Sequence, residues 1–237
     1  MPAPTITRRH VLCASGAALL AGAPRARATA TAPAVAGTES APSLAGVRAA
    51  LDAWIPDYLA TMNAPGLTLA LASRELGDDV RTYGRASLDG GARVAPSHLF
   101  QIGSITKSFV GLVLLQLQDE GRVDLQRAVT AYLPWLRIEQ PFGPVTLHHL
   151  LTHTSGFPTE SPLVPSGGAR LRPAYAPGIR FHYSNWAYDV LGHVIATVAG
   201  EPWPRAVERR VMRPLGMRDS VGAITPAIAT RAATGHV

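Results

Sequence analysis

The feature that most constrains this chain is an apolar helix that begins beside its only lysine, Lys107. The apolar residues after Lys107 lie nearly all the way round a helix, which is typical of a helix buried inside a domain. Gly121 is placed to end it, because glycine readily adopts the left-handed conformation found after helix ends. The apolar residues are Phe109, Val110, Leu112, Val113, Leu114, Leu115 and Leu117.

Ser104 lies three residues before Lys107, a spacing that puts both side chains on one face of a helix. An ammonium can lose its proton at a reachable cost, whereas a guanidinium cannot. A hydroxyl beside an amine that can be neutral is a nucleophile beside a base. We therefore predict that Ser104, in the first turn of this helix, is a nucleophile and Lys107 its base. The alternative is a chance pairing of the two residues.

The N-terminus has the pattern of an export signal. Arg8 and Arg9 precede an apolar run over residues 11–21, which small residues follow. The pattern predicts a twin-arginine signal over residues 1–30, with an ordinary secretory signal as the alternative. The composition of residues 31–43, rich in Ala, Pro, Ser and Thr, predicts a disordered linker. The exported protein is expected in the periplasm or outside the cell, without a stable membrane anchor, because the apolar run is too short to span a bilayer.

The formal charge of +6 does not indicate a nucleic-acid-binding protein. Arg8, Arg9, Arg25 and Arg27 all precede the first acidic residue, Glu39. The rest of the chain is therefore only weakly basic, and we expect no nucleic-acid partner.

Hydrophobic periodicity and turn residues predict the elements before Ser104. They are an amphipathic helix over 44–62, bent or started late at Pro56, a strand over 67–72, a turn at 77–79, a return strand over 80–86 and an extended segment over 98–102.

A mostly helical region is predicted after Gly121. It comprises a short helix over 145–152, an irregular segment over 157–180 that could form a wall of a binding cleft, a helix over 186–198 and a last helix over 204–212. His148, His149 and His153 lie close together, but no carboxylate spacing completes a zinc set, so we expect no metal site and a structural role for His153 in a turn.

A second constellation is Tyr183-Ser184-Asn185, which stands just before a predicted helix. On that loop Tyr183 and Asn185 could face Ser104. The alternative is a packed tyrosine and an asparagine that caps the helix, and Asn185 could also do both.

The motifs S-I-T-K at 104–107 and Y-S-N at 183–185 together resemble those of the serine hydrolases related to class C β-lactamases. This family includes D-alanyl-D-alanine carboxypeptidases and β-lactamase-like esterases. The stretches at 145–156 and 213–217 are similar too. The resemblance implies that Ser104 is the acylated nucleophile and that Lys107 and Tyr183 share its proton. It also implies that Asn185 donates a hydrogen bond to the substrate amide.

The implied fold is an α/β (α+β) fold of the β-lactamase/transpeptidase type, with a helical lobe beside an antiparallel sheet flanked by helices. Residues 44–237 are then the N-terminal part of a serine hydrolase domain, with the helical lobe at about 119–217. Relatives carry a third motif, Lys-Thr-Gly or His-x-Gly in kind, on a strand beside the nucleophile. None follows Tyr183. We therefore expect an incomplete sheet and a truncated chain that is poorly soluble and nearly inactive alone.

The resulting hypothesis is an exported serine hydrolase that forms an acyl-enzyme at Ser104. Its substrate is a small molecule or peptide, namely a β-lactam, a D-Ala-D-Ala-type peptide or a small ester, and these remain open. No cofactor or metal is implied. The alternative is a catalytically incompetent fragment or a non-catalytic, penicillin-binding-like homologue.

Overall fold

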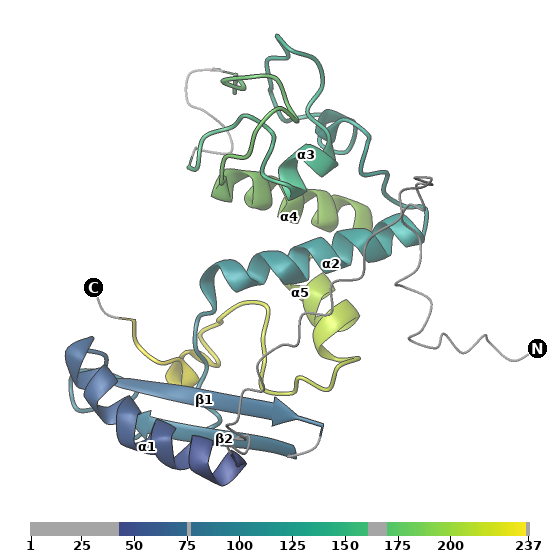
Figure 1. Cartoon of the computed structure of the whole chain (residues 1–237). Coiled ribbons are helices and arrows are strands. Elements are labelled where there is room, and N and C mark those ends of the chain that lie inside the picture. Colours follow the sequence, from purple (N-terminus) through teal and green to yellow (C-terminus); the bar gives the residue numbers. More distant parts are fainter. Residues whose placement is uncertain (1–42, 75–76, 161–169, 236–237) are drawn as a thin grey trace, which may run out of the picture. The chain divides into compact units, whose positions relative to one another are not determined.

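The computed structural model describes residues 43–74, 77–160 and 170–235 (Figure 1). The predicted export signal lies outside these residues, as does the predicted linker except for Ser43. Within the described part of the chain, no helix is both long enough and apolar enough to cross a membrane.

Helix α1 spans Leu44–Thr61. It begins where the Ser43 hydroxyl accepts a hydrogen bond from the backbone N–H of Gly46, at 3.1 Å. The predicted late start at Pro56 is wrong, because the helix begins at Leu44 and runs on through this residue. The neighbouring Ile55 is only 3% exposed, so packing maintains the helix despite the hydrogen bond that a proline removes.

Strands β1 (Gly66–Ser73) and β2 (Gly77–Gly84) form a two-stranded antiparallel ribbon. Its register pairs Gly66 with Gly84 and Ser73 with Gly77. The chain therefore reverses between Ser73 and Gly77, and the predicted turn at 77–79 is wrong. These residues belong to β2, although aspartate is depleted in strands.

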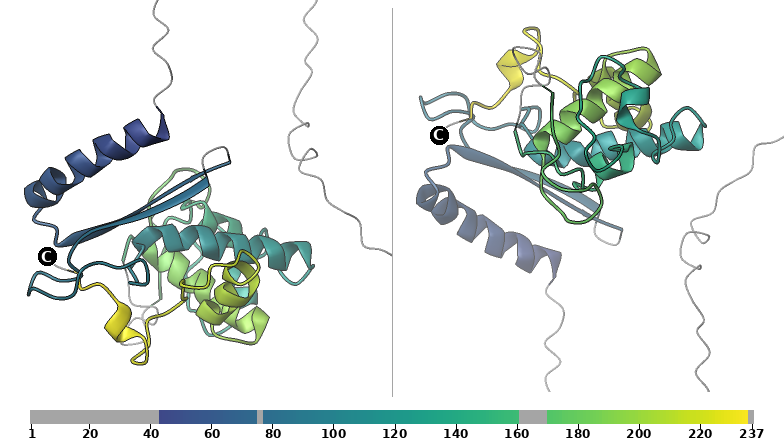
Figure 2. Two further views of the ribbon diagram at one scale, coloured as in Figure 1. Left: turned by 90° about the horizontal axis from the view of Figure 1, so that it is seen from below. Right: turned by 90° about the horizontal axis from the view of Figure 1, so that it is seen from above.

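Ionic contacts between α1 and β2 explain why the acidic start of β2 pairs as a strand. The Asp79 carboxylate accepts hydrogen bonds from Arg48 of α1 and Arg81 of β2, both at 2.9 Å. Asp52 of α1 accepts from Arg81 and, at 2.6 Å, from the hydroxyl of Tyr83. Figure 2 shows α1 along one face of the ribbon.

The predicted extended segment at 98–102 is not a strand of this ribbon. Leu99 forms an isolated parallel bridge with Ala232 instead. Its backbone N–H donates to the carbonyl of Arg231, and its carbonyl accepts from Ala233, both at 2.8 Å. The segment that leads to Ser104 is thus anchored to residues more than a hundred positions later in the sequence.

The remaining helices follow the predicted order closely. Gly121 and Gly200, with φ of +70° and +74°, end α2 and α4 as expected. The helices are α2 (Thr106–Asp119), α3 (Leu147–Leu151), α4 (Asn185–Ala199) and α5 (Trp203–Val207), which continues as a π-helical turn over Glu208–Met212.

A single apolar core joins α2, α3, α4 and α5. Its fully buried side chains include Val113, Leu114, Leu117, Leu150, Trp186, Leu191 and Ile195. The expectation that α2 is buried all the way round is wrong, because Leu112 is 42% and Leu115 48% exposed. The other helices of this core pack against the opposite side of α2.

Candidate active site

Ser104 lies at the junction between the extended segment and α2. It occupies a 3-10 turn over Gly103–Ile105, and α2 itself begins at Thr106. Ser104 therefore lies just before α2, and not in its first turn as the sequence predicts. The turn runs directly into the helix, because the backbone N–H of Thr106 donates to the carbonyl of Gly103. Gly103 has a φ of +52°, which favours glycine.

The hydroxyl of Ser104 lies within hydrogen-bond distance of an amine and a phenol, each of which can accept a proton only in its deprotonated form. The ammonium of Lys107 donates to its Oγ at 3.1 Å. The hydroxyl of Tyr183, 79 positions later in the chain, lies 2.5 Å from the same atom. The Ser104 side chain is exposed and Lys107 is half-buried. A substrate can thus reach the hydroxyl while the amine is held beneath it.

Lys107 also acts on the electrostatics of Tyr183. Its Nζ lies 4.9 Å from the centroid of the tyrosine ring. The pKa of Tyr183 is lowered below its usual value, chiefly by a hydrogen bond to Lys107 and secondly by one to Ser104. A tyrosine with a lowered pKa carries more phenolate, and phenolate accepts a proton from a neighbouring hydroxyl.

Asn185 is the first residue of α4, and its side chain amide lies next to the same amine. Its Oδ1 accepts from Lys107 at 2.7 Å, and its Nδ2 donates to Oε1 of Glu160 at 2.5 Å. Asn185 does not cap α4. Ser184 does so, because its Oγ accepts from the backbone N–H of Ala187 at 3.1 Å.

His153 holds the loop that carries Tyr183 and Ser184. It lies in a turn with a φ of +56°, is 9% exposed, and its Nδ1 accepts from the backbone N–H of Ser184 at 3.1 Å. The centroid of its ring lies 4.5 Å from the centroid of the Tyr183 ring. Burial, and then the charge of Lys107, lowers the pKa of His153. The imidazole is therefore neutral, as an acceptor must be.

Glu160 is the residue of this cluster that the sequence reasoning missed. It lies inside the irregular segment that we predicted to be a wall of a cleft. One signal could have drawn attention to it, since Glu160 is the only acidic residue between Phe157 and Arg180.

The three histidines do not gather into a metal site. His149 belongs to a capping box with Thr146, where its Nδ1 accepts the threonine's backbone N–H at 3.2 Å. No group of three or more potential ligands occurs among the described residues.

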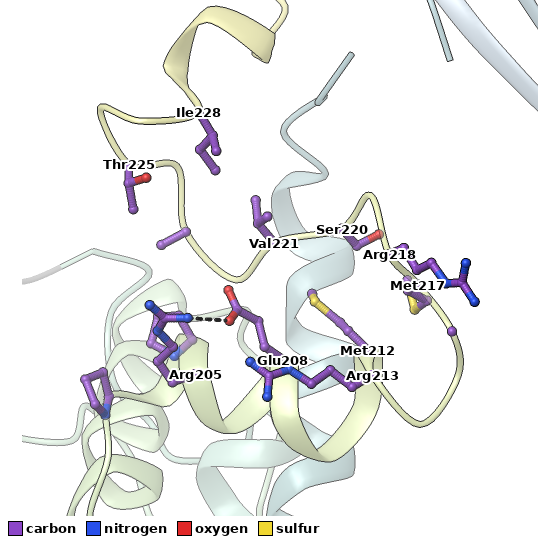
Figure 3. A pocket seen from close by; sticks show the side chains of 14 residues that line it. Arg205, Glu208, Met212, Arg213, Met217, Arg218, Ser220, Val221, Thr225 and Ile228 are labelled. Carbon is purple, nitrogen blue, oxygen red and sulfur yellow. Dashed lines mark hydrogen bonds and ion pairs between the residues drawn. The ribbon is translucent and has the colours of Figure 1, made fainter. Parts of the chain in front are cut away.

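One of two cavities borders the predicted site residues, and the other does not. A small one of about 180 Å³ is lined by Lys107, Asn185 and Asp189, among others. A larger one of about 670 Å³ lies between α5 and the segment that follows it (Figure 3). An ion pair between Arg205 and Glu208 stands at its edge, and none of the four predicted site residues lines it.

Comparison with known proteins identifies the family. The family model described as beta-lactamase matches residues 51–237. The D-alanyl-D-alanine-carboxypeptidase/endopeptidase AmpH of Escherichia coli K12 is 32% identical over 167 residues, covering 62% of this chain and 42% of AmpH. Esterase EstB of Burkholderia gladioli is 36% identical over 166 residues, covering 59% of this chain and 42% of EstB. The chain thus spans about two fifths of the length of these relatives.

A solved structure agrees with this assignment. The crystal structure of D-alanine carboxypeptidase AmpC from Burkholderia cenocepacia superposes with a TM-score of 0.71 at 28% identity, covering 82% of this chain and 55% of that one. The predicted fold class is confirmed, and the two-stranded sheet of the described residues is consistent with the predicted incomplete sheet. Because the family model covers more than half of the residues, this chain belongs to the serine β-lactamase-related family.

Proposed function

We propose that this chain is the nucleophile-bearing part of a serine hydrolase that forms an acyl-enzyme at Ser104. The observation that carries the proposal is the position of the Ser104 hydroxyl, 3.1 Å from Nζ of Lys107 and 2.5 Å from the hydroxyl of Tyr183. A nucleophile with a base at hydrogen-bond distance is the arrangement that covalent catalysis requires.

In the proposed reaction, Oγ of Ser104 attacks the carbonyl carbon of the substrate while its proton passes to the Lys107–Tyr183 pair. A tetrahedral oxyanion forms, and its collapse breaks the bond to the leaving group, which receives a proton from the same pair. Water then attacks the acyl-serine and regenerates the hydroxyl. The lowered pKa of Tyr183 supports its part in the proton transfer.

We assign Asn185 the role of a hydrogen-bond donor to the substrate. A side-chain amide carries two N–H donors, and the bond to Glu160 engages only one. Its Oδ1 meanwhile accepts from Lys107, which orients the amide and holds the amine near Ser104.

The proposed substrates are a β-lactam, a D-Ala-D-Ala-type peptide or a small ester. The family name and the names of AmpH and EstB support these classes. We further propose that the protein is exported to the periplasm or beyond, from the arginine pair and apolar run of the N-terminus.

Covalent labelling tests the function. The chain is incubated separately with a fluorescent penicillin and a fluorophosphonate, and bound fluorophore is quantified after denaturation. Labelling needs one acylation and no turnover, so we expect it even from a chain that is nearly inactive, and Ser104→Ala should abolish it. The matched control is Ser108→Ala, which removes an exposed hydroxyl one helical turn further along α2 and should label normally. Equal labelling of Ser104→Ala, or no labelling by either probe, would contradict the proposal.

A further inference from the structure

The segment that carries Glu160 is tied to the start of α4. The backbone carbonyl of Thr159 accepts the N–H of Asn185 at 2.8 Å. The hydroxyl of Ser184 donates to the carbonyl of Pro158 at 2.7 Å. These bonds fix the backbone immediately before Glu160 relative to Asn185. The carboxylate is therefore held in place by more than its own side-chain contact.

A line of contacts connects this carboxylate to the candidate nucleophile. Glu160 accepts from Asn185, the oxygen of Asn185 accepts from Lys107, and Lys107 donates to Ser104. Glu160 is itself exposed, so a substrate group that reaches Asn185 also reaches the carboxylate.

Two acidic side chains, Glu160 and Asp189, lie at this end of the site together with the ammonium of Lys107. Asp189 lies four positions after Asn185 on α4, on the same face of the helix, and lines the small cavity beside Lys107. Burial, and then the charge of Glu160, raises the pKa of Asp189. Asp189 is therefore less readily ionised, and Glu160 supplies the negative charge. Glu160 lies on the Nδ2 side of the Asn185 amide and the ammonium of Lys107 on the Oδ1 side. A cationic group beside Nδ2 would be attracted by Glu160, and an anionic group would be repelled.

We propose that Glu160 makes the site selective for substrates whose acyl group carries a cationic nitrogen near the reacting carbonyl. The inference deepens the proposed function and rests on it. An ammonium in this place donates a charge-assisted hydrogen bond to Glu160 while Asn185 keeps a donor for the substrate carbonyl. A carboxylate in the same place lacks that bond and meets repulsion.

The test compares acyl groups that differ only in charge. Benzylpenicillin, ampicillin and carbenicillin carry hydrogen, an ammonium and a carboxylate at the same carbon. The ester pair is the p-nitrophenyl ester of a trimethylammonium-substituted butyric acid and its tert-butyl isostere. It tests the attraction between charges alone, because a trimethylammonium nitrogen carries no N–H to donate. Acylation rates are measured at about pH 6.5, below the usual pKa of an α-amino group. We expect the wild-type rate to favour the cationic member of each set by about 3- to 10-fold over the neutral one, with the anionic member slowest.

Glu160→Gln removes the charge and keeps an oxygen that can accept from Asn185. The rate ratio between cationic and neutral members should fall to near one. A structural role would slow every probe by the same factor and leave the ratio unchanged, which overturns the inference. The matched control is Glu201→Gln, beyond the far end of α4. At about 24 Å along the helix, well beyond the Debye length of about 10 Å at 0.1 M salt, it should not alter the ratio.

Failure of the inference and failure of the function have different signatures. If neither set acylates the wild-type chain, the proposed function falls and the inference with it. If both sets react at Ser104 without discrimination by charge, only the inference about Glu160 falls.

Discussion

Replacing Lys107 with arginine tests whether its amine accepts the proton of Ser104. The side chain donates to Ser104 at 3.1 Å and to Asn185 at 2.7 Å, and both partners are acceptors. An arginine keeps the charge and still offers donors to both atoms. The substitution therefore preserves most of the electrostatics and removes chiefly the ability to release a proton at working pH.

The expected loss in the acylation rate is at least 100-fold, the lower end of the range for general base catalysis. At 25 °C this corresponds to about 2.7 kcal/mol of transition-state stabilisation. Tyr183 is the other candidate acceptor, 2.5 Å from Ser104, so a loss of this size would show that the phenol cannot replace the amine.

The assay is the second-order rate of labelling by a fluorophosphonate, followed over time and read together with a thermal melt of the same sample. The melt of Lys107→Arg should stay close to that of the parent, which separates a chemical loss from a folding defect. Labelling at near-parental rates would refute the role of the amine.

Three further predictions concern the frame of the site and the leader. Ser184→Ala should lower the free energy of unfolding by about 2 kcal/mol in urea titrations, because it removes the cap of α4 and a hydroxyl that is 0% exposed. Burial lowers the folded-state pKa of His153, so as the pH falls below about 6.5 the unfolded chain binds more protons than the folded chain. The free energy of unfolding should therefore drop in this pH range. In a plot of the urea midpoint against pH, His153→Asn should make this drop smaller. Changing Arg8 and Arg9 to lysine should leave precursor in the cytoplasm on fractionation, and normal export would count against a twin-arginine signal.

The local parts of the fold could be predicted from the sequence. The positions of the helices, of β1 and of the later part of β2 follow from apolar periodicity, and the ends of α2 and α4 follow from Gly121 and Gly200. The proximity of Ser104 and Lys107 needed only helical spacing. That of Tyr183 and Asn185 could be expected from the resemblance.

Features that depend on distant contacts could not be predicted in this way. Aspartate disfavours strands, and Asp79 lies in one because arginines of α1 and β2 surround it. Ser184 and Asn185 are both good capping residues, so only the packing of the loop decides between them. Glu160 reaches Asn185 because of hydrogen bonds between segments about 25 positions apart.

The most direct test of the central claim is detection of the acyl group on Ser104. The chain is mixed with a p-nitrophenyl ester, quenched with acid at successive times, digested and analysed by mass spectrometry. We predict that the peptide containing Ser104 gains the mass of one acyl group, that the adduct is lost again as water hydrolyses it, and that Ser104→Ala never acquires it. Release of p-nitrophenol with no adduct on this peptide, or with an adduct on another residue, would contradict the account.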